Sequence, residues 1–469
     1  MFIKQLYTGC ISEAAYYIES NGEAAVIDPL RDIDTYLQLA AERKATIKYI
    51  FETHFHADFV SGHIDLSKAT GATIVYGPGT QTSFKVHVAR DGETFPLGAL
   101  AIKALHTPGH TLESTCYLLQ EETGRDHCIF TGDTLFVGEV GRPDLAQKGD
   151  DLTTRELAGM LYDSLHAKLL SLEDTVIVYP AHGPGSACGK NLGAETYSTI
   201  GMEKETNYAL KAADKEAFII AVTEGLPEPT AYFPINAEIN KQGYDSIDAI
   251  LENGLKPISV QDVKEAVAKG VWLLDTRPAE QFTQGFVPGS VFIGLEGRFA
   301  EWAGSLLPFD QPLILVTEAG AERETIVRLA RVGFSKVIGY LEGGYEAWKQ
   351  AGEEIDLVIE VEADELAMDI PFDENLLVLD VRKPVEFADG HVKDARNLPL
   401  SELTDPASMA DFEDEQNLYV HCAGGYRSMI AASLLKRQGI HNLRNVTGGW
   451  ARIKDQPGIE KAKEKSVLN

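Results

Sequence analysis

Short apolar runs that end in polar residues recur along the first half of the chain. Examples are "AAVIDP", "IKYIFETH", "LAIKALHTPGH", "HCIFTGD" and "TVIVYPAHG". Each run has the length of a buried strand, and loops at strand ends commonly carry functional residues. The pattern predicts an α/β domain over residues 1–250, whose trailing edge is the Pro-, Gly- and Asn-rich stretch near 225–245.

The second half of the chain contains an internal repeat. The segment "LLDTRPAEQFTQGFVPGSVFIGL" matches "VLDVRKPVEFADGHVKDARNLPL", so that Asp275 corresponds to Asp380, and "YLEGGYEAW" later matches "NVTGGWARI". Each unit has the size of an ordinary domain. We therefore predict two related α/β domains, over residues 256–356 and 358–469.

Composition and charge exclude several classes of partner. The 469 residues carry a formal net charge of −29, which disfavours nucleic acid and anionic membranes as partners. A membrane-spanning helix would need a run of about 18 apolar residues, and the sequence has none. The N-terminus lacks a secretory pattern. The five cysteines are odd in number and scattered, which is typical of free thiols in a reducing compartment. We expect a cytoplasmic protein.

His and Asp residues with metal-ligand chemistry cluster in the loops after the apolar runs. They are His54, His56 and Asp58 in "THFHADF", His110 in "HTPGHT", Asp133 in "IFTGDTLF" and His182 in "YPAHGPG". A lone histidine is more often structural, but a structural role explains a set of this kind poorly. The sequence therefore predicts a metal centre in the first domain.

This motif set resembles the metallo-β-lactamase fold on its glyoxalase II branch, over residues 1–240. The resemblance implies an αββα sandwich. Hydrolytic members carry H-x-H-x-D-H in the first motif and bind two metals, and the final His of the motif ligates the second metal. Phe59 stands at that position here. We expect the second site to bind metal poorly or not at all.

Persulfide dioxygenases of the same branch hold a single Fe(II) with two His and one Asp. The resemblance assigns these roles to His54, His110 and Asp133 and implies one Fe(II) per chain, with zinc as the alternative. Such a facial triad leaves open positions for a sulfur substrate and for O2.

The other members of the cluster are His56, Asp58 and His182. They are expected to orient the metal ligands or to form part of a second metal site. Arg142, in "VGEVGRPDL", faces the substrate in the resemblance, and a surface ion pair is the alternative.

The segment after His182 reads "GPGSACGKNLG", where single-domain dioxygenases carry Asp-Tyr, so the substrate pocket is expected to differ. Cys188, on this Gly-rich loop, is either a catalytic carrier of persulfide near the metal or a small buried filler.

A second chemical signal lies in "LYVHCAGGYRSMIAASLLKRQG", where an apolar strand runs into Cys422. Gly424, Gly425 and Tyr426 form a short loop whose backbone N–H groups can bind an anion. A following helix N-terminus and Arg427 add positive potential. Together they stabilise a thiolate and make Cys422 a nucleophile.

The Cys422 loop and the whole repeat resemble rhodanese, a sulfurtransferase fold whose Cys carries a persulfide. In the first repeat "ILVTEAGAERE" aligns with this loop, so that Glu318 replaces the cysteine and Arg323 matches Arg427. Glutamate forms no persulfide, and we expect its carboxylate to fill the anion-binding loop and to pair with Arg323. We interpret residues 256–356 as a catalytically inactive rhodanese-like domain that serves as a spacer or docking module.

The domain order is similar to bacterial persulfide dioxygenase–sulfurtransferase fusions of the CstB type, which serve sulfide detoxification. The resemblance implies oxidation of a low-molecular-weight thiol persulfide by O2 to sulfite, and sulfane-sulfur transfer through Cys422 that forms or uses thiosulfate. Glutathione, coenzyme A, bacillithiol and cysteine are all compatible carriers, and a homo-oligomer is compatible as well. Two alternatives stay open: a zinc-dependent glyoxalase II-like thioester hydrolase with rhodanese accessory domains, and a non-enzymatic sulfur-carrier scaffold.

Overall fold

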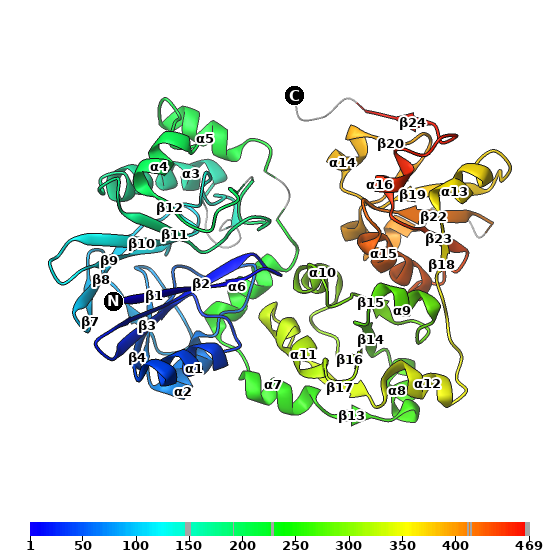
Figure 1. Cartoon of the computed structure of the whole chain (residues 1–469), viewed down its shortest axis with the longest axis horizontal. Helices are drawn as coiled ribbons and strands as arrows, with labels where there is room; N and C mark the ends of the chain where they lie inside the picture. The colour runs from blue at the N-terminus through cyan, green and yellow to red at the C-terminus, as the bar shows by residue number, and fades with distance from the viewer. Residues whose placement is uncertain (146–151, 191, 227–228, 410–411, 413–414, 465–469) are drawn as a thin grey trace. The chain divides into compact units, whose positions relative to one another are not determined.

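The chain divides into two compact units in a computed structural model (Figure 1). The structure describes residues 1–145, 152–190, 192–226, 229–409, 412 and 415–464. Unit 1 comprises Met1–Ala249 with Val327–Ser335, and unit 2 comprises Ile250–Ile326 with Lys336–Asn469. Within the described residues no helix is long and apolar enough to cross a membrane.

Two six-stranded sheets form unit 1. The first contains β1 (Phe2–Thr8), β2 (Glu13–Ser20), β3 (Glu23–Ile27), β4 (Thr46–Phe51), β5 (Thr73–Tyr76) and β6 (His87–Val88) in that order. The second has the order β12 (Ser198–Thr199), β11 (Ile177–Pro180), β10 (Asp126–Gly132), β9 (Thr115–Gln120), β8 (Leu100–His106) and β7 (Thr94–Leu97).

Alternating side chains bury both faces of each sheet. Tyr16 on β2 and Tyr117 on β9 belong to one apolar cluster to which both sheets contribute. The neighbouring Tyr17 packs in a cluster with Tyr36 of α1, and Leu118 packs in another with Leu161 of α3. The two sheets therefore face each other, with helices on their outer faces, which confirms the predicted αββα sandwich.

The helices of this region alternate with the strands along the chain. They are α1 (Asp34–Arg43), α2 (His63–Thr70), α3 (Thr154–Ser164) continued by a π-helical turn (Leu165–Leu169), α4 (Ile200–Thr206), α5 (Lys215–Thr223), α6 (Phe233–Gln242) and α7 (Ile247–Gly254). Helix α3 begins with a capping box between Thr153 and Glu156.

Unit 2 contains two five-stranded sheets of one topology. The first has the order β13 (Pro257–Ile258), β17 (Val337–Leu341), β16 (Leu313–Val316), β14 (Trp272–Asp275) and β15 (Val291–Phe292). The second has the order β18 (Ile359–Val361), β23 (Leu443–Val446), β22 (Asn417–His421), β19 (Leu376–Asp380) and β21 (Arg396–Asn397). The matching order shows that the sequence repeat is a structural repeat.

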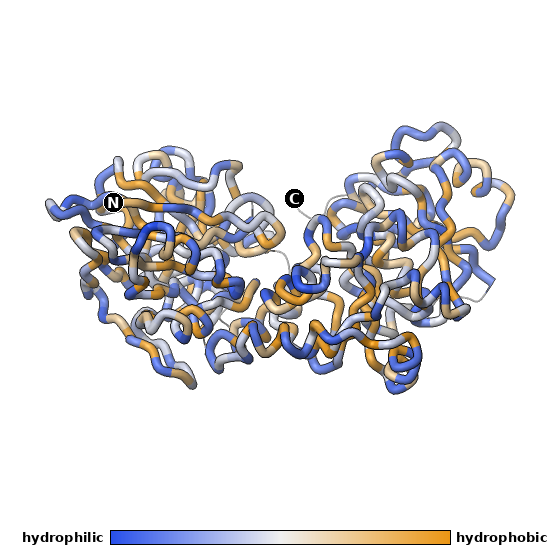
Figure 2. Tube along the Cα trace, turned by 60° about the horizontal axis from the view of Figure 1, so that its bottom comes forward, coloured by the Kyte–Doolittle hydropathy of each residue, from blue (hydrophilic) through white to orange (hydrophobic). Residues whose placement is uncertain are grey.

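Helices connect the parallel strands of both repeats. They are α8 (Val260–Ala268), α9 (Ala279–Gln284), α10 (Phe299–Leu306), α11 (Glu322–Arg331) and α12 (Gly344–Gln350) in the first, and α13 (Ala363–Asp369), α14 (Pro384–Asp389), α15 (Tyr426–Arg437) and α16 (Trp450–Ile453) in the second. A two-stranded pair, β20 (His391–Val392) with β24 (Lys461–Ala462), and two 3-10 turns (Leu400–Glu402, Pro406–Met409) complete it. Figure 2 shows hydrophobic segments running through the interior of both units.

The repeated "LDxR" motif has a structural role. Arg382 donates to both oxygens of Asp380 and to the Gly390 carbonyl, and Arg277 does the same with Asp275 and Gly285 in the first repeat. All four charged side chains are buried. A paired buried charge is tolerated where hydrogen bonds satisfy it, and each Arg links the end of its strand to the loop after the next helix.

Candidate active site: a metal centre and a thiol loop

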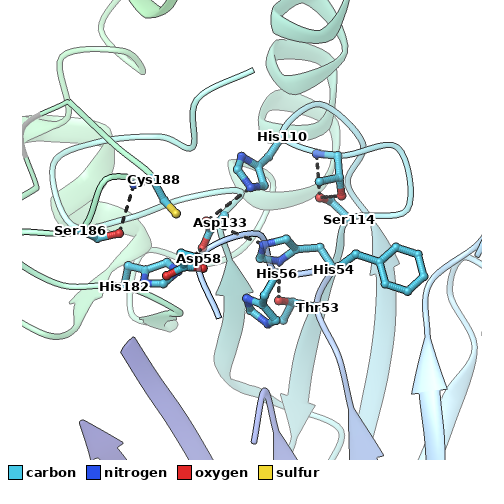
Figure 3. A network of polar contacts seen from close by, with 12 residues as sticks. Thr53, His54, His56, Asp58, His110, Ser114, Asp133, His182, Ser186 and Cys188 are labelled. Atoms are coloured by element: carbon cyan, nitrogen blue, oxygen red, sulfur yellow. Dashed lines mark hydrogen bonds and ion pairs between the residues drawn. The ribbon is translucent and has the colours of Figure 1, made fainter. Parts of the chain in front are cut away.

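His54, His110 and Asp133 meet at one end of the sandwich in unit 1 (Figure 3). His54 follows β4, His110 lies between β8 and β9, and Asp133 follows β10 directly. The Asp133 Oδ2 atom lies 3.4 Å from Nε2 of His110 and 3.8 Å from Nε2 of His54. Both Asp133 oxygens are buried and have no hydrogen-bond partner among the described residues. A buried carboxylate requires a cation, so these residues fit one metal ion.

Neighbouring groups orient both imidazoles. Nδ1 of His110 lies 2.8 Å from the Arg142 carbonyl oxygen, to which it can only donate, and this leaves its Nε2 free to ligate. Nδ1 of His54 lies 2.9 Å from Oγ1 of Thr53. Burial lowers the pKa of His54 well below its usual value, and the neighbouring histidines lower it further. A neutral imidazole is the form that binds metal.

His56 lies close to His54 but is held by acidic side chains. Its Nε2 is 3.0 Å from Asp28 and 3.7 Å from Glu52. Burial alone would lower the pKa of His56, but Asp28, Glu52 and Asp58 raise it to about 9. His56 therefore has acidic partners of its own, and its ligand atom also lies within 4.8 Å of those of Asp58 and His182, as a second metal site would need.

Phe59 is fully buried, and its ring centroid lies 4.3 Å from that of His56. The position at which the hydrolytic motif has a ligand is thus occupied by an apolar ring. Phe59 offers no donor atom, so within the first motif His54 belongs to the three-ligand set and Asp58 to a neighbouring group.

That neighbouring group contains Asp58, His182 and Cys188. Nε2 of His182 lies 3.5 Å from Oδ2 of Asp58 and 3.4 Å from Oδ1 of Asp133. Ligand atoms of Asp133, His182 and Cys188 all lie within 4.8 Å of one another, and the Cys188 sulfur points toward Asp133 (Figure 3). Cys188 is therefore beside the candidate metal centre, where it offers a donor that the first motif lacks.

Cys188 is a buried thiol, and its reactivity depends on burial and on the carboxylates beside it. Burial raises its pKa well above the ordinary value, and the Asp58 and Asp133 carboxylates add to the effect. A thiol in such an environment is a weak nucleophile at neutral pH. A catalytic role of Cys188 remains a prediction.

Arg142 is buried and engaged by other groups. Its guanidinium donates twice to Asp144, with both distances 2.7 Å, and once to the Ala187 carbonyl, while its backbone N–H donates to the Cys188 carbonyl. These bonds fix the loop that carries Cys188, and contact of Arg142 with a substrate remains a prediction. Asp144 and Ala57 also line a pocket of about 270 Å³ with Phe233.

Cys422 lies at the end of β22 in the second repeat, almost completely buried. Its Sγ accepts a hydrogen bond of 3.1 Å from the Gly425 N–H. Gly425 has φ 111°, which a side chain disfavours, and α15 begins at Tyr426. The predicted arrangement of thiol, glycine loop and helix N-terminus is therefore present.

Two long-range contacts shape this loop. A Cβ on Gly449 would lie 2.3 Å from the Cys422 carbonyl oxygen, which explains the glycine directly before Trp450. Arg427 donates 2.7 and 2.8 Å bonds to the two oxygens of Glu386. That carboxylate raises the pKa of Arg427. The expected full charge of Arg427 is therefore largely balanced, and the loop N–H groups and helix N-terminus face the sulfur.

In the first repeat, the expectation that the Glu318 carboxylate fills the anion-binding loop is corrected, while its pairing with Arg323 remains a prediction. Glu318 is exposed and accepts a 2.8 Å hydrogen bond from Gln281. The loop N–H of Gly320 donates instead to Glu322, at 2.8 Å. The carboxylate bound by this loop is thus supplied by the first residue of α11, because the side chain of Glu318 turns toward α9.

Comparisons with known proteins bear on both units. The profile of the metallo-beta-lactamase superfamily matches residues 8–182, and that of the rhodanese-like domain matches residues 259–351 and 362–456. A crystal structure of a metallo-beta-lactamase from Staphylococcus aureus subsp. aureus COL is 31% identical, with a TM-score of 0.66, and the match covers 72% of this chain and 98% of that one. The chain belongs to the metallo-beta-lactamase superfamily. Its second half consists of two rhodanese-like domains.

Other similarities fall on the metallo-beta-lactamase domain. A probable hydroxyacylglutathione hydrolase of Schizosaccharomyces pombe is 27% identical over 237 residues, which are 45% of this chain and 87% of the relative. The crystal structure of ETHE1 from Myxococcus xanthus is 33% identical and matches over its whole length and 51% of this chain, with a TM-score of 0.43.

Several buried acids around the metallo-beta-lactamase site were not predicted as site residues. Asp28 accepts from both the N–H and the hydroxyl of Thr53 and faces His56, while Glu52 faces His56 and His63. Both acids end apolar runs, in "AAVIDP" and "IKYIFETH". That position at a strand end was the available signal, since it is shared by the predicted ligands.

Proposed function

We propose that this chain oxidises low-molecular-weight thiol persulfides at a mononuclear non-haem iron and transfers sulfane sulfur through Cys422, as fusions of the CstB type do. The observation that carries the proposal is the convergence of His54, His110 and Asp133 as a three-ligand set, while Phe59 takes the place of a ligand of the second metal. The buried Phe59 ring removes one donor of the dinuclear motif, although Asp58 and His182 lie close by. Two imidazoles and one carboxylate with open positions are typical of oxygen-activating iron sites.

A ferrous ion held by this triad would supply the binding and activation of dioxygen. The net reaction converts RSSH, O2 and water into RSH, sulfite and two protons. The protein residues orient the ligands, through Thr53 on His54 and the Arg142 carbonyl on His110. The adjoining pocket beside Ala57, with Phe233 in its wall, would take the organic part of the thiol.

Sulfur transfer would occur at Cys422. Its thiolate attacks the outer sulfur of a second RSSH, the S–S bond breaks, and RSH leaves after taking up a proton. Sulfite then attacks the outer sulfur of the Cys422 persulfide, and thiosulfate forms. The electron pair returns to Sγ of Cys422, where the Gly425 N–H stabilises it. The reverse direction, from thiosulfate to RSSH, uses the same groups.

A zinc-dependent thioester hydrolase is the second candidate. It is favoured by the proximity of Asp133, His182 and Cys188, which could complete a second metal site. A relative of the first domain also carries the name hydroxyacylglutathione hydrolase.

Metal content and oxygen uptake distinguish the two candidates. Protein purified without oxygen should contain one iron per chain and consume O2 with glutathione persulfide, whereas two zinc ions and hydrolysis of glutathione thioesters would support the hydrolase. Asp133→Ala removes the anionic ligand and should abolish iron binding and O2 uptake together. Asp126→Asn, at the other end of β10, is the control and should change neither. Full iron content and full uptake in Asp133→Ala would refute the assignment.

A further inference from the structure

Helix α15, which begins at the Cys422 loop, carries a row of polar contacts to the first repeat. Oη of Tyr426 donates a 2.9 Å hydrogen bond to the Gly294 carbonyl. Two turns later Oγ of Ser433 accepts a 2.9 Å bond from the N–H of Phe292. One turn beyond, Arg437 donates a 2.7 Å hydrogen bond to the Gly289 carbonyl.

The three contact residues of α15 are spaced i, i+7 and i+11, which places them on one face of a helix. Their partners lie on or beside β15, an edge strand in the sheet of the first repeat. The Phe292 N–H on this edge finds its acceptor in Ser433 of the second repeat. The Arg437 guanidinium also lies 4.0 Å from the centroid of the Trp272 ring, and Lys436 forms a 2.8 Å ion pair with Asp356. This row of contacts therefore covers an edge of the first repeat.

The contacts are not a general requirement of the rhodanese-like fold. In the alignment that pairs Cys422 with Glu318, the first repeat has Glu322, Leu329 and Gly333 at the positions of Tyr426, Ser433 and Arg437. The polar row is thus confined to the helix that follows the cysteine.

We propose that the first repeat, which lacks a cysteine, holds the thiol loop of the second repeat in its reactive geometry, with Tyr426 as the positioning residue. Tyr426 follows Gly425 directly, and the Gly425 N–H is the donor to Sγ of Cys422. Anchoring the Tyr426 hydroxyl to the first repeat therefore fixes the donor that stabilises the thiolate. This inference rests on the proposed sulfur transfer and gives the inactive repeat a function within it.

The test measures the reactivity of Cys422 in the full chain. The rate of alkylation by iodoacetamide is followed from pH 6 to 9, and the alkylated fraction of Cys422 is measured by peptide-resolved mass spectrometry. Tyr426→Phe removes one hydroxyl and should slow alkylation at neutral pH about two- to tenfold, the range expected for one lost net hydrogen bond. The pH midpoint should rise, and kcat with thiosulfate and cyanide should fall by a similar factor at little-changed KM.

Two further variants make the result specific. Tyr419→Phe is the matched control, because the Tyr419 hydroxyl donates a 2.6 Å bond to Asp369 within the second repeat. It should leave the pH midpoint unchanged. Ser433→Ala loosens the contact two turns from the loop and should shift the midpoint in the same direction as Tyr426→Phe.

The proposal is overturned if Tyr426→Phe behaves like Tyr419→Phe, or if Ser433→Ala keeps the wild-type midpoint. A failure of the sulfur-transfer function itself is recognised separately. In that case the wild-type chain takes no sulfur from thiosulfate or persulfide, while the alkylation profile still decides whether Tyr426 positions the loop.

Discussion

Replacing Asp28 by Asn tests whether Asp28 keeps His56 protonated and so prevents it from ligating a metal. Asp28 faces His56 at 3.0 Å and raises the pKa of His56, with Glu52 and Asp58, to about 9. Asn has nearly the same shape and still accepts from the Thr53 N–H. Without the Asp28 charge His56 should become neutral near pH 7, and its imidazole should then be able to ligate together with Asp58 and His182.

The magnitude follows from the pKa of His56. A rise from 6.5 to about 9 corresponds to about 3 kcal/mol between folded and unfolded states. Because the folded pKa is the higher one, this stabilisation is complete below pH 6.5 and is lost as pH rises through about 9. Asp28 supplies part of it, so Asp28→Asn should flatten the decline by about 1–2 kcal/mol.

Two assays measure the effect of Asp28→Asn on the protonation and the metal binding of His56. Urea unfolding of metal-free protein from pH 6 to 9.5, followed by near-UV signals of unit 1, should show a shallower pH dependence in Asp28→Asn than in the exposed control Asp34→Asn. Zinc titration should show a second ion per chain in the variant at pH 7. An unchanged pH dependence, together with unchanged zinc stoichiometry, would refute the view that Asp28 keeps His56 protonated.

Three further predictions concern both sites. Phe59→His restores a donor to the first motif and should raise zinc stoichiometry in excess metal; no increase would show that the ring is not the block. Cys422→Ser should keep O2 uptake with RSSH while sulfite accumulates in place of thiosulfate, and Glu318→Gln should leave both activities near wild type; loss of O2 uptake in Cys422→Ser would make transfer an obligatory earlier step. Gly449→Ala should unfold at lower urea and transfer sulfur more slowly than Gly439→Ala, because both have positive φ but only Gly449 adjoins Cys422; equal behaviour would exclude the contact as the cause.

Position along the chain was sufficient to predict that the candidate metal-ligating residues cluster, whereas the choice of His54, His110 and Asp133 as the triad came from the family resemblance. His54 and Asp133 follow buried strands directly or nearly so, and adjacent strands bring such ends together. The Cys422 loop was predicted for a similar reason, since the cysteine, the glycines and the helix start are contiguous. Local patterns therefore predicted the fold class and the proximity of the candidate site residues, whose roles remain predictions.

Contacts between distant segments were not predictable from spacing. Glu386 neutralises Arg427 from a position 41 residues away, and Asp28 pairs with His56 from another strand. No local pattern marks such pairs, because the partner is chosen by tertiary packing. The same holds for Glu318, whose carboxylate turns to Gln281 while Glu322 takes the loop.

The first repeat differs from the second at the active-site loop in more than the missing thiol. The second repeat places Gly425 at φ 111° and uses its N–H to contact Sγ of Cys422. The first repeat has Ala321 at the aligned position, where a Cβ disfavours that conformation, and Glu322 already accepts from the loop at Gly320. A thiol at position 318 would therefore lack the N–H donor and would face a carboxylate in the anion-binding loop. Both differences oppose a thiolate, so the first repeat retains the strand order and the buried Arg–Asp pair of the fold without the electrostatics of the site.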